Sequence, residues 1–371
     1  MTKTIHIIAF DIPFPANYGG VIDVFYRVKA LHELGVKITL HCFEYGKRTQ
    51  QIDLEKYCEK VYYYQRKKLV VEFWLPYVVS SRKNASLLKN LQADNAPILF
   101  EAIHCCYFLN QPSLSHRIKL VRTHNIEHDY YKLLALSEKK IAKKLYFLAE
   151  AFLLKSFELK LHQANYILAI SEKDRIQLNG IYGSKVQLIP AFHGNSNYKI
   201  IMGKGNFCFY HGKLSVSENQ QAAIFLIEKV FNQSSYILKI AGDEFSPEIR
   251  NAASQNSNIH LLEGLTPIEI DKHIQEAHIN ILPTFQPTGI KLKLINVMFQ
   301  GRFVLVNPQM VEGSGLEDAC IIAKNNSEFI QKIDELMKQE FTTDLLLERA
   351  KIIGSEFDVL KNAQKIIQLL P

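Results

Sequence analysis

The stretch LPTFQPTGIKLKLINVMFQGRFVLVN, residues 282–307, decides the fold. It predicts a short buried strand, a turn that holds Pro287 and Gly289, a helix beginning near Ile290, and a second apolar strand. Lys291 and Lys293 follow directly behind the turn. The first turn of a helix leaves backbone N–H groups unpaired, and the helix dipole there favours negative charge. In a strand–turn–helix–strand setting, this pattern predicts a bound nucleotide diphosphate.

Outward from this stretch, apolar strand-like runs alternate with segments of helical period along the whole chain. The expected strands cover residues 4–10, 36–43, 60–64, 98–102, 118–122, 166–170, 186–189, 207–210, 236–241, 258–261, 279–282, 303–306 and 319–322. Residues 21–34 have helical spacing and residues 137–162 form a long helical stretch, one helix or two. This alternation is typical of α/β proteins with doubly wound parallel sheets.

A chain of 371 residues exceeds one ordinary core, so two domains are expected. Residues 193–206 are rich in Gly and Asn, lack a clear period, and are interpreted as the interdomain linker. We therefore expect an N-terminal Rossmann-like domain over 1–195 and a C-terminal one over 206–350. The last segment, 351–371, is expected to be a helix that packs back on the first domain. The carboxyl-end loops of both sheets are expected to face an interdomain cleft.

Composition sets the class of protein and of partner. The N-terminus has no signal-peptide pattern, and no apolar run approaches the length of a membrane span. The six cysteines lack metal-ligand spacing, which favours reduced thiols in a cytoplasmic protein and makes a zinc site unexpected. Residues 1–200 hold 28 Lys and Arg against 17 Asp and Glu, whereas residues 201–371 hold 16 against 20. The basic first half indicates an anionic partner such as a membrane surface, or simply a solvated surface.

In the first half, two loops after expected strands carry candidate residues. Gly19 and Gly20 open the first helix, where their amides can approach a ligand, although a tight turn explains them equally well. The run THNIEHDYY follows the strand at 118–122 and holds His124 and Asn125. Asp129 is better explained as a helix cap. His124, nearest the strand end, is the stronger functional candidate.

In the second half, the run FCFYHGKLS places Gly212 and Lys213 at the end of a strand. A lysine there can neutralise a diphosphate leaving group as it gains charge. Asp243 follows the next strand in a similar turn. A further flexible loop contains Gly313 and Gly315. Polar loops after several parallel strands are much stronger evidence together than any one of them alone.

These segments together resemble a retaining glycosyltransferase of the GT-B fold, in the large group 1 (family 4) clan. The segments that carry the resemblance, in the order of the family, are PFPANYGG, THNIEHDYY, ILAISEKD, HGKLSVSEN, AGD, PTGIKLKLINVMFQG and VEGSGL. The resemblance implies a hexose moved from a nucleotide sugar with retention of configuration, without a metal or another cofactor. It also implies a donor held mainly by the second domain and an acceptor held mainly by the first.

Carried over by position, the resemblance gives several residues a role. His124 would touch the transferred sugar, and Gly20 would lie near the donor phosphates or the acceptor. Gly212 and Lys213 would meet the diphosphate. The amides of Gly289 and Ile290 would reach the phosphates or the sugar, with Lys293 nearby as a further catalytic residue, while Asp243, Thr288 and Asn296 would complete the donor site.

The chain also departs from the family. Two glutamates eight positions apart are usual around this helix, and here those positions hold Thr288 and Asn296. A ribose diol can donate two hydrogen bonds to a carboxylate, whereas Asn offers an acceptor and a donor pair. The second basic residue of the Gly-Lys turn is replaced by Glu218 and Asn219.

The leading hypothesis is a cytoplasmic glycosyltransferase of surface-polysaccharide or glycolipid assembly, using a glycan or lipid-linked acceptor. A non-catalytic nucleotide-sugar-binding protein and a GT-B phosphorylase or epimerase are the alternatives. Nucleic acid is not an expected partner, because the basic residues follow no recognisable nucleic-acid-binding pattern. The lysine-rich segment 137–160 suggests peripheral contact with an anionic inner leaflet, although a buried helix with a solvated lysine face fits it as well.

Overall fold

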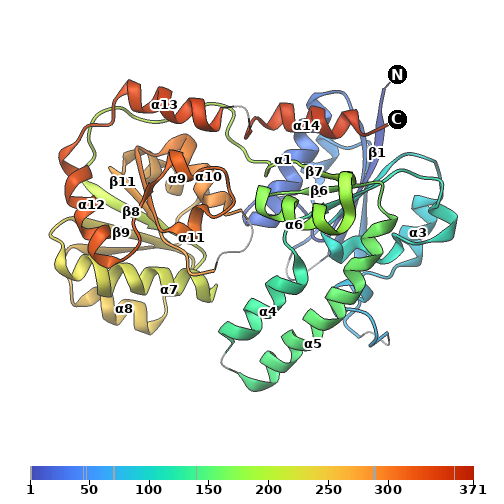
Figure 1. Ribbon diagram of the computed structural model, residues 1–371, viewed down its shortest axis with the longest axis horizontal. Helices are drawn as coiled ribbons and strands as arrows, with labels where there is room; N and C mark the ends of the chain where they lie inside the picture. The colour runs from blue at the N-terminus through green and yellow to red at the C-terminus, as the bar shows by residue number, and fades with distance from the viewer. Residues whose placement is uncertain are drawn as a thin grey trace. The chain divides into compact units, whose positions relative to one another are not determined.

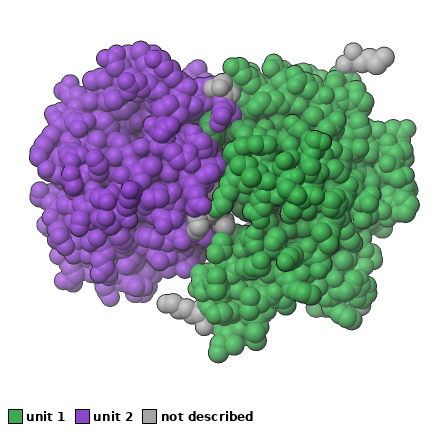
Figure 2. All heavy atoms as spheres, viewed as in Figure 1, with its two compact units in different colours: residues 1–193, 357–371 green, residues 194–356 purple. Residues whose placement is uncertain are grey.

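The structure is a computed structural model and describes residues 2–44, 46, 48–69, 72–138, 140–286, 290–354 and 356–371. The chain divides into two compact units (Figure 2). Unit 1 comprises residues 1–193 and 357–371, and unit 2 comprises residues 194–356. Each unit is an α/β domain built on one parallel sheet, as the alternation in the sequence predicts.

Unit 1 contains a 7-stranded sheet with the order β3-β2-β1-β4-β5-β6-β7. All of its paired neighbours are parallel. The strands are β1 (Thr4–Ala9), β2 (Lys37–Glu44), β3 (Lys60–Gln65), β4 (Ile98–Glu101), β5 (Lys119–Thr123), β6 (Tyr166–Ala169) and β7 (Val186–Leu188). The expected strands of the first half are confirmed, with ends that differ by a residue.

Helices cover both faces of this sheet (Figure 1). They are α1 (Gly19–Glu33), α2 (Tyr77–Ser80), α3 (Ala85–Leu91), α4 (Glu127–Ser137), α5 (Ile141–Glu158), α6 (Glu172–Tyr182) and α14 (Val359–Gln368). Alternation along the strands separates two cores: in β1, Ile7 packs in the core with α1 and α14, and Ile8 packs in the core with α2, α3, α5 and α6. This two-sided burial explains why the strands are apolar without polar alternation.

The expected long helix over residues 137–162 is divided differently in the structure. Its start is the end of α4, and its main part is α5, which is followed by a 3-10 turn at Leu159–Gln163. α4 and α5 form an antiparallel hairpin that extends away from the sheet of unit 1 (Figure 1). Among the residues that the structure describes, no helix combines the length and apolarity needed to cross a membrane.

The end of the chain returns to unit 1. α14 packs beside α1, and the Lys3 ammonium donates to the carbonyls of Ile367 and Leu370 at 3.0 and 2.8 Å. The His193 ring also bonds the Phe357 carbonyl at 2.9 Å. The chain therefore crosses between the units at two places, next to His193 and next to Phe357.

Unit 2 contains a 6-stranded parallel sheet with the order β10-β9-β8-β11-β12-β13. Its strands are β8 (Phe207–His211), β9 (Ile237–Gly242), β10 (Ile259–Glu263), β11 (Ile279–Leu282), β12 (Phe303–Val306) and β13 (Ile321–Ile322). Its α-helices are α7 (Ser217–Phe225), α8 (Pro247–Ser254), α9 (Pro267–Glu276), α10 (Leu292–Gln300), α11 (Pro308–Val311), α12 (Asn326–Lys338) and α13 (Thr343–Ile353).

Most of the segment interpreted as a linker packs on unit 2. The Lys199 amide donates to the Phe299 carbonyl at 2.8 Å, and Gly203 forms an isolated antiparallel bridge with Phe341. These backbone bonds replace the regular structure that the Gly- and Asn-rich sequence does not form.

Candidate functional site

Each sheet has one place where the strand order reverses. In unit 1 it lies between β1 and β4, and in unit 2 it lies between β8 and β11. Loops at the carboxyl ends of such neighbouring strands diverge to opposite faces of the sheet, which leaves room for a ligand. Gly19 and Gly20 follow β1, and Gly212 and Lys213 follow β8, whereas His124 and Asp243 follow the strands β5 and β9 next to these places.

In unit 2, the loop after β8 is closely packed around Gly212. A Cβ atom at this position would lie 3.0 Å from Cγ of Asn219, and the Asn219 amide donates to the Lys213 carbonyl at 2.9 Å. The loop therefore folds back on the start of α7. The Lys213 side chain remains exposed at the end of the strand.

Asp243, at the end of β9, holds this loop in place. Its Oδ1 accepts from the Leu214 amide at 2.6 Å, and its Oδ2 accepts from the Ser215 hydroxyl at 2.9 Å. The sequence predicts a direct role for Asp243 at the donor. In the structure both carboxylate oxygens bond the loop that carries Lys213, so Asp243 positions this loop, and its expected donor contact stays a prediction.

Lys293, on α10, approaches the same loop. Its ammonium donates to Oδ1 of Asn219 at 3.0 Å and lies 5.1 Å from the centre of the Tyr210 ring. Burial lowers the pKa of Lys293 to about 8, because the charged form loses solvation. An anion bound at this ammonium would offset the solvation that the charged form has lost.

Glu218 and Lys291 form an ion pair beside Lys293. The Glu218 carboxylate lies 3.3 Å from the Lys291 ammonium and accepts a short hydrogen bond from the Thr284 hydroxyl. The sequence marks Glu218 and Asn219 as the loss of a basic residue. In the structure, α10 brings Lys293 to Asn219, so a cation does lie beside this turn, supplied by another element.

The helix of the opening stretch begins two residues later than expected. Lys291 has extended backbone angles and forms the N-cap of α10, without a side-chain cap hydrogen bond. Ile290 precedes it and is partly buried. Thr288 and Gly289, both expected at the donor, lie outside the described residues, so their roles stay predictions.

Asn296 belongs to a network of amide side chains. Its Nδ2 donates to Oδ1 of Asp271 at 3.0 Å, while its Oδ1 accepts from Asn195 at 3.0 Å and from Gln300 at 2.8 Å. Both ends of the Asn296 amide are thus engaged within unit 2. Its expected donor contact stays a prediction, and a ligand would have to compete with these partners.

In unit 1, four charged side chains lie fully buried where β4 and β5 meet α1. They are Asp23, Arg27, Glu101 and Arg122, each at most 1% exposed. Arg27 donates to Asp23 at 2.6 Å and makes a short bond to Glu101, and Arg122 donates to Asp23 at 3.0 Å. Burial alone would raise the pKa of Asp23, but Arg122 and Arg27 outweigh it and hold the pKa below the usual range. The four charges balance.

This buried network orients His124. Nε2 of His124 lies 3.2 Å from Oε2 of Glu101, and the ring packs edge-on against Phe10. The Glu101 carboxylate, which also pairs with Arg27, accepts this bond, so Nε2 is the donor. In the neutral ring, Nδ1 is then an acceptor. Asn125 follows His124 and is partly buried.

One ligand atom each from Asp23, Glu101 and His124 lies within 4.8 Å of the others, a spacing that a metal ion could bridge. Both carboxylates, however, are already neutralised by Arg27 and Arg122. A divalent cation would have to displace one of these buried arginines. The arrangement therefore fits an ion-pair network better than a metal site.

Gly19 and Gly20 begin α1 as the sequence predicts. A Cβ atom at Gly20 would lie 2.6 Å from Cζ of Phe10, so glycine here permits the close approach of the ring that packs on His124. Next to it, Asp11 accepts a hydrogen bond from Tyr18 at 2.6 Å. The structure gives Gly20 a packing role, and ligand contacts of Gly19 and Gly20 stay predictions.

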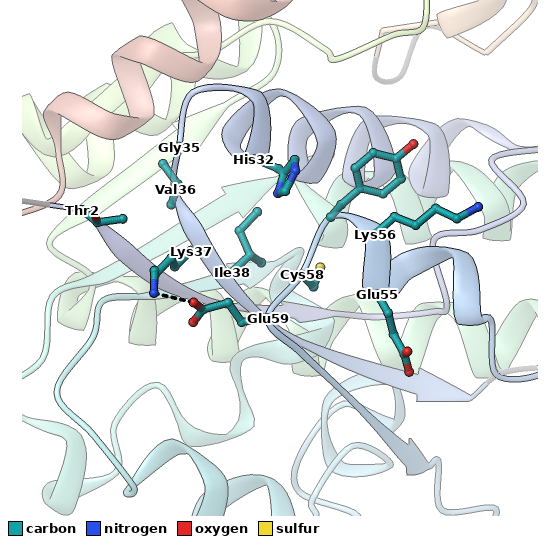
Figure 3. Close-up of a pocket in the computed structure, with 11 residues that line it drawn as sticks. Thr2, His32, Gly35, Val36, Lys37, Ile38, Glu55, Lys56, Cys58 and Glu59 are labelled. Carbon is teal, nitrogen blue, oxygen red and sulfur yellow. Dashed lines mark ion pairs between the residues drawn. The ribbon is translucent and has the colours of Figure 1, made fainter.

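The surface pocket in Figure 3 lies in unit 1, at the amino ends of the strands. Its lining includes Lys37, at the amino end of β2, and Glu59, just before β3, which form an ion pair at 2.7 Å. The remaining lining residues are Thr2, His32, Gly35, Val36, Ile38, Glu55, Lys56, Tyr57 and Cys58. This pocket is separate from the candidate residues, which lie at the carboxyl ends of the strands.

No protein-family model matches the chain. Solved structures share its architecture over almost its full length. A TarM variant from S. aureus, in complex with fondaparinux, α-GlcNAc-glycerol and UDP, has a TM-score of 0.67 at 11% identity, covering 99% of each chain. The chain has the GT-B fold.

Other solved structures are similar to the chain to the same degree. Anabaena Alr3699/HepE, in complex with UDP and glucose, has a TM-score of 0.66 at 11% identity, covering 99% of this chain and 98% of that one. A glycosyltransferase from Rickettsia africae has a TM-score of 0.63 at 14% identity, covering 99% and 97%. At the sequence level, an uncharacterized 44.6 kDa protein in the cps region of Klebsiella pneumoniae is 28% identical over 356 residues, with 90% of each protein covered.

Sequence reasoning missed the buried network behind His124. A signal was present, because Glu101 and Arg122 are single charges inside the apolar strand runs ILFEAI and KLVRTH. Asp23 and Arg27 lie four residues apart on α1, which places them on one helix face. A charge inside an otherwise buried strand requires a partner, although the sequence does not identify it.

Proposed function

We propose that this GT-B protein is a glycosyltransferase that moves a hexose from a nucleotide sugar to a glycan or lipid-linked acceptor, with retention of configuration and without a metal. The UDP complexes of structural neighbours support a nucleotide-sugar donor. The relative in a cps region supports a role in surface-polysaccharide assembly. We also propose a cytoplasmic location, which the cysteine pattern of the sequence supports.

The observation that carries the proposal is a group of lysines at the carboxyl ends of the strands of unit 2. Lys213, Lys291 and Lys293 gather around the loops after β8 and β11, and the acidic partners Glu218 and Asp243 are already bonded within the protein. A diphosphate leaving group gains charge as the glycosidic bond breaks, so nearby ammonium groups stabilise the transition state. One charge-assisted contact contributes roughly 1.5–3 kcal/mol, or about one to two decades in rate.

In unit 1, His124 is proposed to bind the transferred sugar. Glu101 fixes the ring so that Nδ1 can accept a hydrogen bond from a sugar hydroxyl. In this arrangement Glu101 is a positioning residue. Arg27 bonds the other carboxylate oxygen, Oε1, which leaves Oε2 of Glu101 to accept from the His124 ring.

The test is a donor screen that uses thermal shift on the full chain, followed by sugar transfer to candidate acceptors. We expect a nucleotide sugar to raise the melting temperature, and Lys213→Ala to weaken this effect. Lys272→Ala is the matched control, because Lys272 is an exposed lysine of α9 in the same unit. Failure of every nucleotide sugar to bind would refute the proposal. Unchanged donor binding in Lys213→Ala would remove Lys213 from the site.

The engaged Asn296 amide favours one alternative, a GT-B protein that binds nucleotide sugars without transferring them. Asn296→Glu alone would place a carboxylate beside Asp271, which now accepts from the Asn296 amide at 3.0 Å. The informative variant therefore combines Asn296→Glu with Asp271→Asn. Donor binding without turnover in the native chain, together with turnover in this double variant, would establish the alternative.

Two finer parts of the proposal have their own tests. NMR of the anomeric proton in the product distinguishes retention from inversion of configuration. Turnover that persists in EDTA supports the metal-independent mechanism, whereas loss of turnover that added Mg²⁺ restores would contradict it.

A further inference from the structure

The outer face of α5 is apolar and exposed to solvent. Ile141, Leu145, Leu148 and Phe152 are 77%, 61%, 44% and 73% exposed. Their spacing of four, three and four residues puts them in one stripe along the helix. The opposite face already serves unit 1, where Ala151, Leu154 and Phe157 are buried. The stripe is thus additional to the surface that α5 needs for folding.

A second exposed apolar group lies in the loop between β3 and α2. Leu69, Phe73 and Trp74 are 90%, 81% and 60% exposed. The end of this loop is attached to α5, because both carboxylate oxygens of Glu150 accept from the Tyr77 amide, at 2.9 and 3.0 Å. The end of the loop therefore packs at the buried face of α5, the helix that carries the stripe on its outer face.

Most of the charges around these two groups are positive, and the one acid of the loop, Glu72, is paired with Lys83 at 3.0 Å. Exposed lysines are Lys67 and Lys68 in the loop and Lys140, Lys144, Lys155 and Lys160 along the hairpin. The acids of α5 have partners inside unit 1: Glu150 bonds the Tyr77 amide, and Glu158 accepts from the His128 amide at 3.1 Å. The surface that α5 presents outward is consequently both apolar and cationic.

Two kinds of occupant suit an apolar helical stripe, a second helix or a lipid surface. The spacing matches a coiled-coil seam for only two repeats, and Lys155 takes the next seam position, whereas a stable seam needs about three to four heptads. A second copy of this chain would also bring its lysines against the same lysines. Anionic headgroups, in contrast, neutralise the lysines while the acyl boundary takes the apolar side chains.

We propose that α5 and the loop around Trp74 seat unit 1 on an anionic bilayer surface. Leu145, Leu148 and Phe152 enter the boundary between headgroups and acyl chains, and Lys144 and Lys155 contact the headgroups. Trp74 and Phe73 occupy the interfacial zone that aromatic side chains prefer. This surface lies outside the candidate donor and sugar residues, and its contact with a bilayer does not depend on sugar transfer.

The experiment uses the full chain without donor and vesicles of phosphatidylcholine, with or without phosphatidylglycerol. We expect co-sedimentation only with the anionic vesicles, weakened by salt. The chain contains 1 tryptophan, so a blue shift of its emission reports directly on Trp74. The variant Leu145→Ser/Phe152→Ser should lower partitioning by about tenfold or more, because it removes two apolar side chains that enter the bilayer. Lys144→Glu/Lys155→Glu should lower it by at least about tenfold on anionic vesicles.

Ile268→Ser is the matched control, since Ile268 is 81% exposed in unit 2, and it should bind like the native chain. Circular dichroism and the melting temperature confirm that each variant is folded. Equal binding to neutral vesicles, or no binding, would overturn the proposal. So would unchanged Trp74 emission, or a native dimer that Leu145→Ser/Phe152→Ser converts to a monomer. If the chain binds vesicles but no nucleotide sugar, the proposed function is refuted and the membrane proposal is not.

Discussion

The two units place charge at the same position of the same topology and use it in opposite ways. In unit 1, Asp23, Arg27, Glu101 and Arg122 are buried and satisfy one another behind His124. In unit 2, the charged side chains at the reversal of the strand order are partly or fully exposed.

This difference separates charges that maintain the structure from charges that are available to bind a ligand. A buried, balanced network costs several kcal/mol when one partner is lost, because the remaining ion stays desolvated. A partly buried lysine without a full counter-charge, such as Lys293, already carries a desolvation cost that an anion can offset. The comparison predicts opposite effects when a charge is removed from each unit.

The largest expected effect is in unit 1. Arg122→Met should lower the free energy of unfolding by about 3–5 kcal/mol, because Asp23 loses a partner in a fully buried site. Denaturant unfolding measures it. The matched control is Arg250→Met, which breaks an exposed pair with Glu263 and should cost at most about 1 kcal/mol. Similar losses in both variants would erase the distinction between the units.

Lys293→Met should have the opposite pattern. We expect UDP affinity to fall by about ten- to a hundredfold, since a charge-assisted contact is lost. Stability should stay constant or rise, because a desolvated ammonium is replaced by an apolar side chain of similar length. Calorimetry with UDP and denaturant unfolding measure the two effects. A clear loss of stability would mean that Lys293 is structural, like the charges of unit 1.

The pH dependence of UDP binding should follow Lys293. Burial lowers its pKa to about 8 in the free protein, and a bound diphosphate should raise it. Below pH 8 the ammonium is charged in both states, so affinity is full. Above pH 8 binding requires proton uptake, and affinity should fall by up to about tenfold per pH unit. Titration calorimetry across this range tests it, and Lys293→Met should abolish the slope.

Glu218→Gln should produce the smallest effect. It removes a negative charge near the proposed diphosphate while an oxygen remains to accept from Thr284, so UDP affinity should rise by about two- to fivefold. The measurement belongs below pH 7, because Glu218 also helps to keep Lys293 protonated. Weaker binding at this pH would indicate that Glu218 itself contacts the ligand.

Elements were easier to predict than side-chain roles. Apolar runs marked the strands of both sheets because parallel strands covered on both faces must be apolar along their whole length. Helix ends were less certain: α10 begins at Leu292, because Lys291 is extended. The role of Asp243 depended on the loop after another strand, since it bonds the Leu214 amide across 29 residues of sequence.

The sequence by itself determined the doubly wound architecture and the positions of Gly212, Lys213 and His124 at strand ends, because local periodicity and turn residues are short-range properties. Only the tertiary structure decided that Lys293 approaches Asn219, that Glu101 orients His124, and that α5 exposes a second apolar face. These pairings join residues distant in the chain. Their energies depend on burial and on the exact partner, and neither property is encoded in a local pattern.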